Sequence, residues 1–357
     1  MIVRRVAALL FLPLMLAFGT GVYMYLGSLK SRTVKEHAQL PTVTKPRFVL
    51  PGTMFVVQQG RLFKLNRGSF TEIGPSGDWS QPALTPDHSR MVAVLRNGTS
   101  SDLYLLDVKG NVVKRLTRDD SRVLTANHWA FYPRVSSDGQ SVFFGTDNPK
   151  FSNIDPGVDL SIWSMPLSGG QAQGRRWSDP YWYTGGDTSP IPVAGEVLFV
   201  RHSIDNTTAV HSQIYFQTRP LAIANALTPA ADDCTEPALS PNGQQLAMIC
   251  SHGGRVTTLE VGAFSGGILG ARRVLLQGGL YASPAWSPDG TALAYYAPTG
   301  ATGHFQLWYL ALPAQPAPPP ASPAASATPL VFPTPQPSPI QVTQGVDLTA
   351  TSPPAWY

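Results

Sequence analysis

Residues 283–290 read Ser-Pro-Ala-Trp-Ser-Pro-Asp-Gly, and residues 236–243 read Glu-Pro-Ala-Leu-Ser-Pro-Asn-Gly. In both, a short apolar stretch that begins with proline runs into a turn. Proline presets the second position of a type I turn, and glycine accepts a positive φ at low cost. Looser copies begin at Pro82, Pro133 and Pro190, and a partial copy, Pro354-Ala355-Trp356, ends the chain. A unit that recurs in this way is one supersecondary motif stacked several times.

Each unit is expected to hold four strands. In the last full copy these are expected at 283–287, 291–296, 304–310 and 340–343. The runs that follow the turns are β-branched or aromatic, as in Val142-Phe-Phe, which favours strands. Apolar residues at helical spacing are not sustained over any long segment. Four-stranded units that recur about every 45 to 60 residues are typical of β-propeller blades, so the expected fold class is all-β.

The two ends of the chain indicate the number of blades. Three strands are expected at residues 54–57, 60–65 and 69–73, without a Pro-Ala-Trp strand before them. Residues 353–356 supply an innermost strand without the three strands that would complete its blade. Joined, they make one blade. The expected fold is therefore a six-bladed propeller over residues 53–357, closed by the C-terminal strand. A closed ring removes the open sheet edges that invite aggregation.

At these residues the chain resembles the TolB-type propeller repeat, the WD40-like module of bacterial envelope proteins. The family pattern places a Leu-Thr and an Asp shortly before Pro-Ala-Trp-Ser-Pro-Asp-Gly and an apolar strand, and residues 81–95, 234–249 and 281–296 match it well. The copies at Pro133 and Pro190 match less closely. The resemblance implies the propeller fold and interaction with other envelope proteins. It is specific for fold and weak for function, because propellers host many unrelated activities.

Residues 6–26 are apolar apart from Thr20 and have basic residues on both sides. Twenty-one helical residues would span roughly 31 Å, which is enough to cross a bilayer core. We therefore expect an uncleaved signal anchor, a transmembrane helix, within residues 1–30 and a stalk linker over residues 31–52. A cleaved signal peptide, with Ala17-Phe18-Gly19 as the cleavage site, is the alternative.

The orientation of this anchor rests on opposing indications. More basic residues follow the span than precede it, which favours a cytoplasmic propeller under the positive-inside rule. The short Arg-Arg leader and the usual home of the TolB-type family favour the other side. We expect a single-pass membrane protein whose propeller is extracytoplasmic, on the periplasmic or extracellular side.

The two cysteines, Cys234 and Cys250, flank the expected hairpin of the fifth blade. If the hairpin is centred near Asn242, the two cysteines lie equally far from its centre and face each other. A cross-strand disulfide would suit an oxidising compartment, and two buried thiols are the alternative. A Pro-rich insertion at 313–339 is expected to be a disordered or polyproline-like loop between the last two strands of the sixth blade, with a docking or spacer role as the alternative.

Motifs of catalysis are lacking from the sequence. It has no Gly-x-Ser-x-Gly elbow, His-Glu-x-x-His, paired Cys-x-x-Cys or phosphate-binding glycine loop. We expect no catalytic residue, no cofactor and no metal, and we interpret the aspartates of the repeat as turn formers. The net charge is +4 without a cluster of Lys and Arg, so nucleic acid is not an expected partner.

Partners of propellers usually contact the loops that lead into the innermost strands, because these loops surround one mouth of the central channel. Here those loops contribute Asp78, Trp79, His128, Trp129, Asp187, Asp233 and Tyr281. Exposed aromatic side chains near carboxylates make good protein-binding anchors. Packing between blades would equally explain each aromatic residue, and capping of the neighbouring loop would explain the carboxylates.

Our first hypothesis is a membrane-tethered, non-catalytic scaffold, expected to be monomeric, that binds an envelope protein, a peptide or a small ligand. The alternative is a propeller enzyme, such as a hydrolase, lyase or cyclase, with a site in the central channel. Such a site would need convergent His, Asp, Glu or metal-binding groups from several blades. A sensor ectodomain is a third hypothesis.

Overall fold

The computed structural model describes residues 48–149, 158–181, 183–254, 256–299, 303–313 and 338–357. The chain divides into two units, Met1–Thr42 and Val43–Tyr357, and the first lies outside the described residues. The predicted anchor at 6–26, most of the stalk and nearly all of the Pro-rich insertion also lie outside them. In the described part of the chain, no helix has the length and apolar character needed to cross a membrane.

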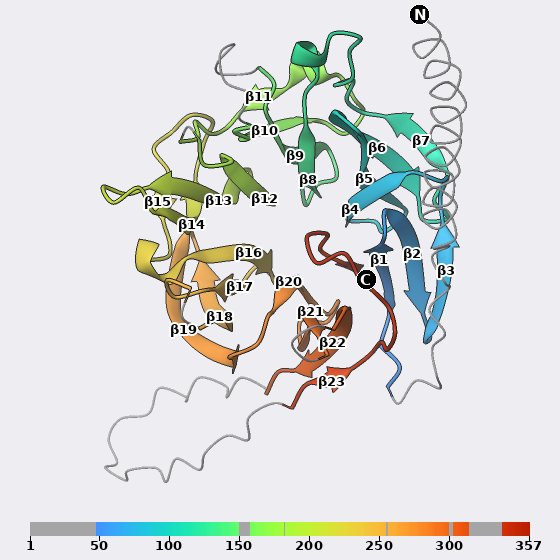
Figure 1. The fold of residues 1–357 in the computed structure, drawn as a ribbon, viewed down its shortest axis with the longest axis vertical. Coiled ribbons are helices and arrows are strands. Elements are labelled where there is room, and N and C mark those ends of the chain that lie inside the picture. The colour runs from blue at the N-terminus through green and yellow to red at the C-terminus, as the bar shows by residue number, and fades with distance from the viewer. Residues whose placement is uncertain (1–47, 150–157, 182, 255, 300–302, 314–337) are drawn as a thin grey trace, which may run out of the picture. The chain divides into compact units, whose positions relative to one another are not determined.

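Six four-stranded antiparallel sheets surround a central axis, as Figure 1 shows, so the predicted all-β, six-bladed propeller with four-stranded blades is confirmed. From the channel outwards, the first blade consists of β24 (Ala355–Trp356), β1 (Thr53–Gln58), β2 (Arg61–Asn66) and β3 (Ser69–Ile73). The second consists of β4 (Asp78–Leu84), β5 (Arg90–Asn97), β6 (Ser100–Asp107) and β7 (Val112–Arg115). The third consists of β8 (Ala130–Val135), β9 (Ser141–Thr146), β10 (Ser161–Pro166) and β11 (Arg175–Arg176).

The fourth blade consists of β12 (Asp187–Val193), β13 (Glu196–Ile204), β14 (Val210–Gln217) and β15 (Asn225–Ala226). The fifth consists of β16 (Cys234–Leu239), β17 (Gln245–Cys250), β18 (Thr258–Ser265) and β19 (Ile268–Gln277). The sixth consists of β20 (Ala282–Trp286), β21 (Ala292–Pro298), β22 (Phe305–Ala311) and β23 (Ile340–Gln341). Short 3-10 helices occupy Leu124–Ala126, Gln171–Gln173 and Ala230–Asp232.

Hydrophobic packing joins each blade to both of its neighbours. The described core separates into six apolar clusters, and each cluster combines side chains from two adjacent blades. In the cluster between the sixth and first blades, for example, Tyr296 of β21 packs with Met54 of β1 and Phe63 of β2. All six residues of β1 are buried, as are six of the seven in β21. Strands buried on both faces need a neighbour on each side, which a ring provides.

The aspartates of the repeat shape the hairpins between the first and second strands. Ser287 Oγ donates to Asp289 Oδ1 at 2.6 Å, and the Thr291 N–H donates to the same oxygen at 3.1 Å, while Gly290 has a φ of 70°. These hydrogen bonds lower the pKa of Asp289. In the fifth blade, Asn242 accepts from Ser240 Oγ at 2.7 Å in the same way. The aspartates are therefore turn formers, as predicted.

In the fourth and sixth blades, a hydroxyl side chain just beyond the fourth strand replaces the next bond of the backbone ladder. The sixth-blade strand was expected at 340–343 but ends at Gln341, and Thr343 Oγ1 accepts the Leu307 N–H at 2.8 Å. Thr228 Oγ1 accepts the Ile214 N–H at 3.0 Å in the fourth blade, just beyond β15. The Leu-Thr of the repeat thus ends the strand rather than extending it.

A bulge interrupts the innermost strand in five blades. The residue before the repeat proline adopts a left-handed backbone, with φ between 51° and 56°, at Gln81, Tyr132, Ser189, Glu236 and Ser283. The strand register shifts at the same places, for example between Thr235 and Ala238 in β16. Proline has no N–H for the ladder, and a bulge accommodates it while redirecting the preceding side chain.

The C-terminal residues lie against the first blade. β24 pairs with β1 through Met54 opposite Trp356 and Phe55 opposite Ala355. The Thr53 N–H donates to the Tyr357 carbonyl at 2.7 Å, and the Tyr357 N–H donates back to the Thr53 carbonyl at 2.9 Å. A Cβ placed on Gly52, whose φ is 78°, would lie 2.4 Å from the Tyr357 carbonyl oxygen.

Replacing Gly52 by alanine is expected to destabilise the protein through this contact. The matched control is Gly98→Ala, because Gly98 also has a positive φ of 54° but has open space around its Cβ position. Gly98→Ala should lower the free energy of unfolding by about 1 kcal/mol for the left-handed backbone alone. Gly52→Ala should add a further ~1–3 kcal/mol for the clash. Equal losses in denaturant unfolding would contradict the observed contact.

Candidate functional site

Two of the residues predicted to contact a partner at the channel mouth are instead structural. Trp79 is only 1% exposed, packs edge-on against Tyr104 at 5.5 Å, and donates its Nε1–H to the Pro75 carbonyl at 2.8 Å. Asp187 is fully buried and accepts two hydrogen bonds from the Arg201 guanidinium, at 2.7 and 2.9 Å. Burial keeps both side chains from a partner, so the expectation of direct contact is wrong for them.

The structure brings Asp78 and Trp129 together around one arginine. Arg96 lies 3.8 Å from the exposed carboxylate of Asp78 and 5.9 Å from the ring centre of Trp129, which stacks on Phe131. Trp129 is half-buried, and its backbone N–H donates to Asp147 Oδ1 at 2.7 Å. The start of β4, the end of β5 and the segment before β8 therefore place a carboxylate, a cation and an indole ring close together.

The other predicted residues contact residues of their own blade or of the preceding one. His128 Nδ1 lies 3.5 Å from Asp147 Oδ1. Asp233 Oδ1 accepts the Ser212 N–H at 3.1 Å and lies 3.3 Å from His211 Nδ1. Tyr281 donates its hydroxyl to the Gln277 carbonyl at 3.1 Å and stays half-buried. His128 thus lies beside Trp129 and shares Asp147 Oδ1 with it, whereas Asp233 and Tyr281 precede the fifth and sixth blades and belong to separate sets of contacts.

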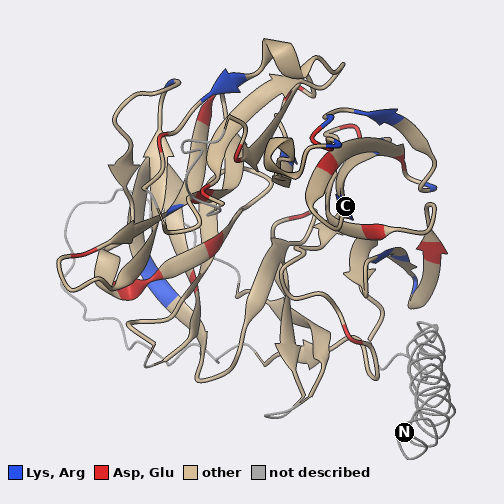
Figure 2. Cartoon of the chain, turned by 45° about the horizontal axis from the view of Figure 1, so that its top comes forward, with Lys and Arg blue, Asp and Glu red and all other residues tan. Residues whose placement is uncertain are grey.

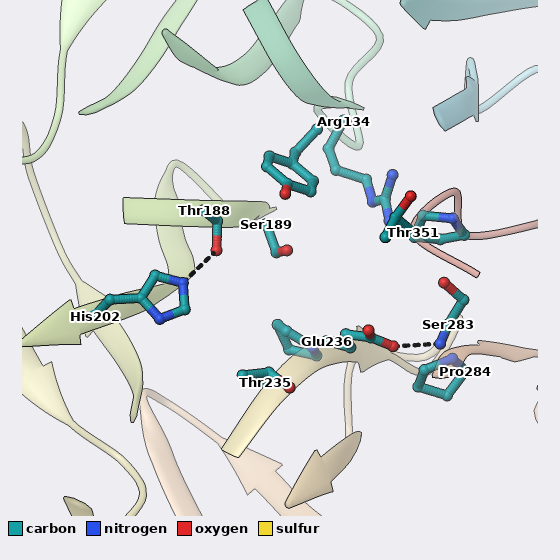
Figure 3. Close-up of a pocket in the computed structure, with 12 residues that line it drawn as sticks. Arg134, Thr188, Ser189, His202, Thr235, Glu236, Ser283, Pro284 and Thr351 are labelled. Carbon is teal, nitrogen blue, oxygen red and sulfur yellow. Dashed lines mark hydrogen bonds between the residues drawn. The ribbon is translucent and has the colours of Figure 1, made fainter. Parts of the chain in front are cut away.

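The central channel contains a cavity of about 220 Å³ that the sequence analysis missed (Figure 3). Its walls come from innermost strands of four blades, from β13, and from the segment that precedes β24. The lining residues are Tyr132, Arg134, Thr188, Ser189, His202, Thr235, Glu236, Pro237, Ser283, Pro284, Thr351 and Pro353. Four of them are the left-handed residues of the bulges, so the repeat proline itself directs side chains into the channel.

Hydrogen bonds around the channel link the bulges of successive blades. Gln81 Oε1 accepts the Tyr132 N–H at 2.6 Å, and the Gln81 N–H donates to Ser352 Oγ at 2.7 Å. On the opposite side, Glu236 Oε2 accepts the Ser283 N–H, and Ser283 Oγ donates to the Ala350 carbonyl at 2.6 Å. Gln81 and Glu236 therefore do the same structural task in the second and fifth blades.

Glu236 differs from Gln81 in carrying a titratable group. Burial raises its pKa from the ordinary value of 4.5 to about 7, against the lowering effect of the hydrogen bond from the Ser283 N–H. Burial, and the charge of Glu236, also raise the pKa of Tyr132. Near neutral pH the carboxyl group of Glu236 is therefore present in both its neutral and its charged form.

Arg134 supplies positive charge to the cavity. Desolvation lowers the pKa of its guanidinium to about 10, so it stays charged at neutral pH. Nη1 donates to the Pro133 carbonyl at 3.0 Å, and within the described residues Arg134 forms no ion pair with a carboxylate. Arg134 is half-buried, and a partly desolvated cation without a counter-ion is costly, which makes this arginine unusual for a purely structural residue.

His202 completes the polar lining of the cavity. Its Nδ1 lies 2.9 Å from Ser212 Oγ and its Nε2 lies 3.4 Å from Thr188 Oγ1, and burial lowers its pKa. A nucleophilic triad would need a carboxylate where Ser212 stands. Within the described ranges, no group of three or more His, Cys, Asp or Glu is arranged to hold a metal ion. The arrangement suits binding by hydrogen bonds and charge.

Cys234 and Cys250 form a disulfide in the structure, with an S–S distance of 2.07 Å, and they are opposite each other in the register of β16 and β17. Both cysteines are fully buried. Arg272 Nη1 lies 3.2 Å from Cys234 Sγ, and its Nη2 pairs with Asp232. Figure 2 shows the Lys and Arg residues scattered over several blades rather than gathered on one face.

Glu236→Gln is expected to flatten the pH dependence of stability. Because the folded pKa of about 7 lies above 4.5, the folded protein keeps a proton that the unfolded chain releases. The stability contributed by this group is complete below about pH 4.5 and is lost as the pH rises to 7. Glutamine keeps the acceptor for the Ser283 N–H, as Gln81 does for Tyr132, and removes the titration.

Melting temperatures between pH 4.5 and 8 check this expectation. Glu236→Gln should gain stability over the wild type at pH 8 and lose the advantage near pH 4.5. The reciprocal variant, Gln81→Glu, should introduce a second loss of stability with rising pH. Parallel melting curves for Glu236→Gln and the wild type across this range would show that Glu236 is not desolvated.

No protein-family model and no curated protein sequence matches the chain. Among solved structures, it is similar to TolB from Acinetobacter baumannii, with a TM-score of 0.55 and 18% identity over 75% of this chain and 63% of that one. It is also similar to a putative TolB from Agrobacterium tumefaciens, with a TM-score of 0.49 and 14% identity over 73% of this chain and 84% of that one. The comparison with a gluconolactonase from Xanthomonas campestris gives a TM-score of 0.47 and 13% identity over 75% of this chain and 86% of that one.

The chain therefore spans about 63% of the length of the A. baumannii TolB, and at 18% identity this likeness concerns the fold. The six four-stranded blades and the TM-score of 0.55 agree with the repeat pattern in the sequence. The protein has a TolB-type β-propeller fold.

Proposed function

We propose that this protein is a membrane-tethered, non-catalytic propeller that binds a protein or small ligand through its central channel. The observation that carries the proposal is the channel cavity, in which Arg134 holds a charge that no described carboxylate pairs with. A ligand that neutralises this charge would recover part of its desolvation cost. Asp78 and Trp129 at the channel mouth would supply a polar and an aromatic contact for a protein partner.

The tether and the compartment belong to the same proposal. Residues 6–26 have the length and composition of a membrane anchor. The disulfide between Cys234 and Cys250 supports an extracytoplasmic propeller, because disulfides persist in oxidising compartments. The resemblance of its repeat to that of TolB-type envelope proteins supports the same compartment.

A channel enzyme is the alternative, and Glu236 is the observation that favours it. A carboxyl group with a pKa of about 7 in a cavity meets the requirement for a general acid or base. However, Oε2 of Glu236 is already used by the Ser283 N–H, and Gln81 performs the same task without any acid. A structural role therefore accounts for this carboxyl group, which favours binding over catalysis.

The proposal predicts that the channel mouth contacts a partner in cells. A photo-crosslinking amino acid at Trp129 should yield specific adducts, identified by mass spectrometry. The control position is Asp289, which is exposed in a hairpin at the other end of the innermost strands. In spheroplasts, Asp289→Cys should also react with a membrane-impermeant maleimide. Adducts at Asp289 alone would place the binding surface elsewhere, and protection from the maleimide would place the propeller in the cytoplasm.

We propose in addition that the pairing of β24 with β1 closes the ring. Deleting residues 347–357 would remove this pairing, the Ser352 hydroxyl that binds Gln81, and Leu348, which is 2% exposed in the cluster between the sixth and first blades. We expect the truncated protein to unfold cooperatively at a melting temperature lower by many degrees, because two blades lose contacts at once. A melting temperature equal to that of the wild type would rule out this closure.

A further inference from the structure

The cavity in the channel has the chemistry of a site for a small anion. In Figure 3 the side chains of Arg134, Ser189 and Glu236 point toward one common space. Arg134 is the only Arg or Lys among the lining residues, and burial lowers the pKa of His202, which favours its neutral form. Hydroxyl groups of Thr188 and Ser189 border the same space and are able to donate hydrogen bonds.

We infer that the cavity binds the carboxylate group of a ligand, with the guanidinium of Arg134 as its counter-ion and the neighbouring hydroxyl groups as further donors. This inference rests on the proposed binding function and adds the class of ligand. The planar guanidinium matches a carboxylate through two parallel hydrogen bonds. A phosphate group carries more negative charge than one arginine neutralises, and it would face Glu236 as well.

Glu236 sets the conditions under which a carboxylate binds. The titratable groups that line the cavity with it are Tyr132, Arg134 and His202. When Glu236 is protonated, Oε2 still accepts the Ser283 N–H, and Oε1 would carry the proton and donate to the ligand. When Glu236 is charged, it repels the ligand. Binding of a carboxylate is therefore coupled to the proton on Glu236, and the affinity falls as Glu236 loses it.

The size and the walls of the cavity limit the rest of the ligand. A volume of about 220 Å³ is below the ~300–1,000 Å³ that is usual for drug-sized ligands. The buried rings of Pro237 and Pro284 and the partly exposed ring of Pro353 give it apolar walls. These dimensions suit one carboxylate on a small apolar body. That group would belong either to a free small organic acid or to the C-terminal residue of a partner chain.

Calorimetric titration of the purified full-length protein with four probes tests the inference. The probes are N-acetyl-alanine, its amide, acetyl-pentaalanine with a free C-terminus, and the corresponding C-terminal amide. At pH 6 we expect a carboxylate probe to bind at least tenfold more tightly than its amide. Equal affinities for the two carboxylates would indicate free small acids, and a tenfold advantage for the pentapeptide would indicate a partner's C-terminus.

Three variants test whether Arg134 and Glu236 are responsible for the binding. Arg134→Met should abolish the preference for carboxylates while melting no lower than the wild type, because it removes a desolvated charge, and Arg134→Lys should retain part of the preference. In the wild type the affinity should fall about fivefold between pH 7 and pH 8, because the protonated fraction of a group with a pKa of about 7 falls from about one half to about one tenth. Glu236→Gln should bind with the same affinity at both values.

The inference is overturned if carboxylate and amide bind equally, if neither binds, or if Arg134→Met keeps the preference. In each of these cases, partner adducts at Trp129 would leave the proposed binding function standing. Carboxylate binding that requires Arg134, without any adduct at Trp129, would instead support the cavity and remove the protein partner at the mouth.

Discussion

Every blade of this protein is apolar on both faces, and that constraint governs the architecture. The sheets that contain β1 and β21, in the first and sixth blades, cannot leave either face in water, so each blade must be covered on both sides. The six clusters of the core lie between neighbouring blades, including the pair made by the sixth and the first. A ring is the arrangement in which every blade has two neighbours. Most of the apolar surface thus lies in contacts between blades, and the channel is lined by polar side chains together with prolines.

The repeat proline connects this architecture to the candidate site. Lacking an N–H, it forces a bulge into the innermost strand, and the residue before it takes a left-handed backbone that aims its side chain at the channel. The first blade cannot follow this rule, because Pro353 precedes Pro354 and a proline ring excludes a positive φ. There, Ser352 and Thr351 contact Gln81 instead. The position before the repeat proline thus lines the cavity in the third to sixth blades, and it takes part in hydrogen bonds around the channel in the second, third, fifth and sixth.

Unlike the repeat prolines, the charged side chains of Arg134 and Glu236 in the channel are not required by the fold. Gln81 and Glu236 accept equivalent hydrogen bonds, so glutamine alone would satisfy the fold at both places. A carboxyl group with a raised pKa and an arginine without a described counter-ion both cost stability at these positions. Departures from locally favourable choices concentrate at functional sites. This is why the interior of the channel, more than the aromatic residues at its mouth, marks the candidate site.

The sequence by itself determined the fold class, the number of blades and the turn-forming role of the aspartates, because these depend on local patterns of proline, glycine and alternating apolar residues. It also placed Cys234 opposite Cys250, since hairpin register follows from counting along two adjacent strands. Only the tertiary structure decided which polar residues meet. Trp79 and Asp187 lie at the predicted loops yet are buried, while Arg134, Ser189 and Glu236 come from three blades and share a cavity. The position before each repeat proline was a visible signal, but its meaning depends on a left-handed backbone and on contacts between blades far apart in sequence, which no local pattern encodes.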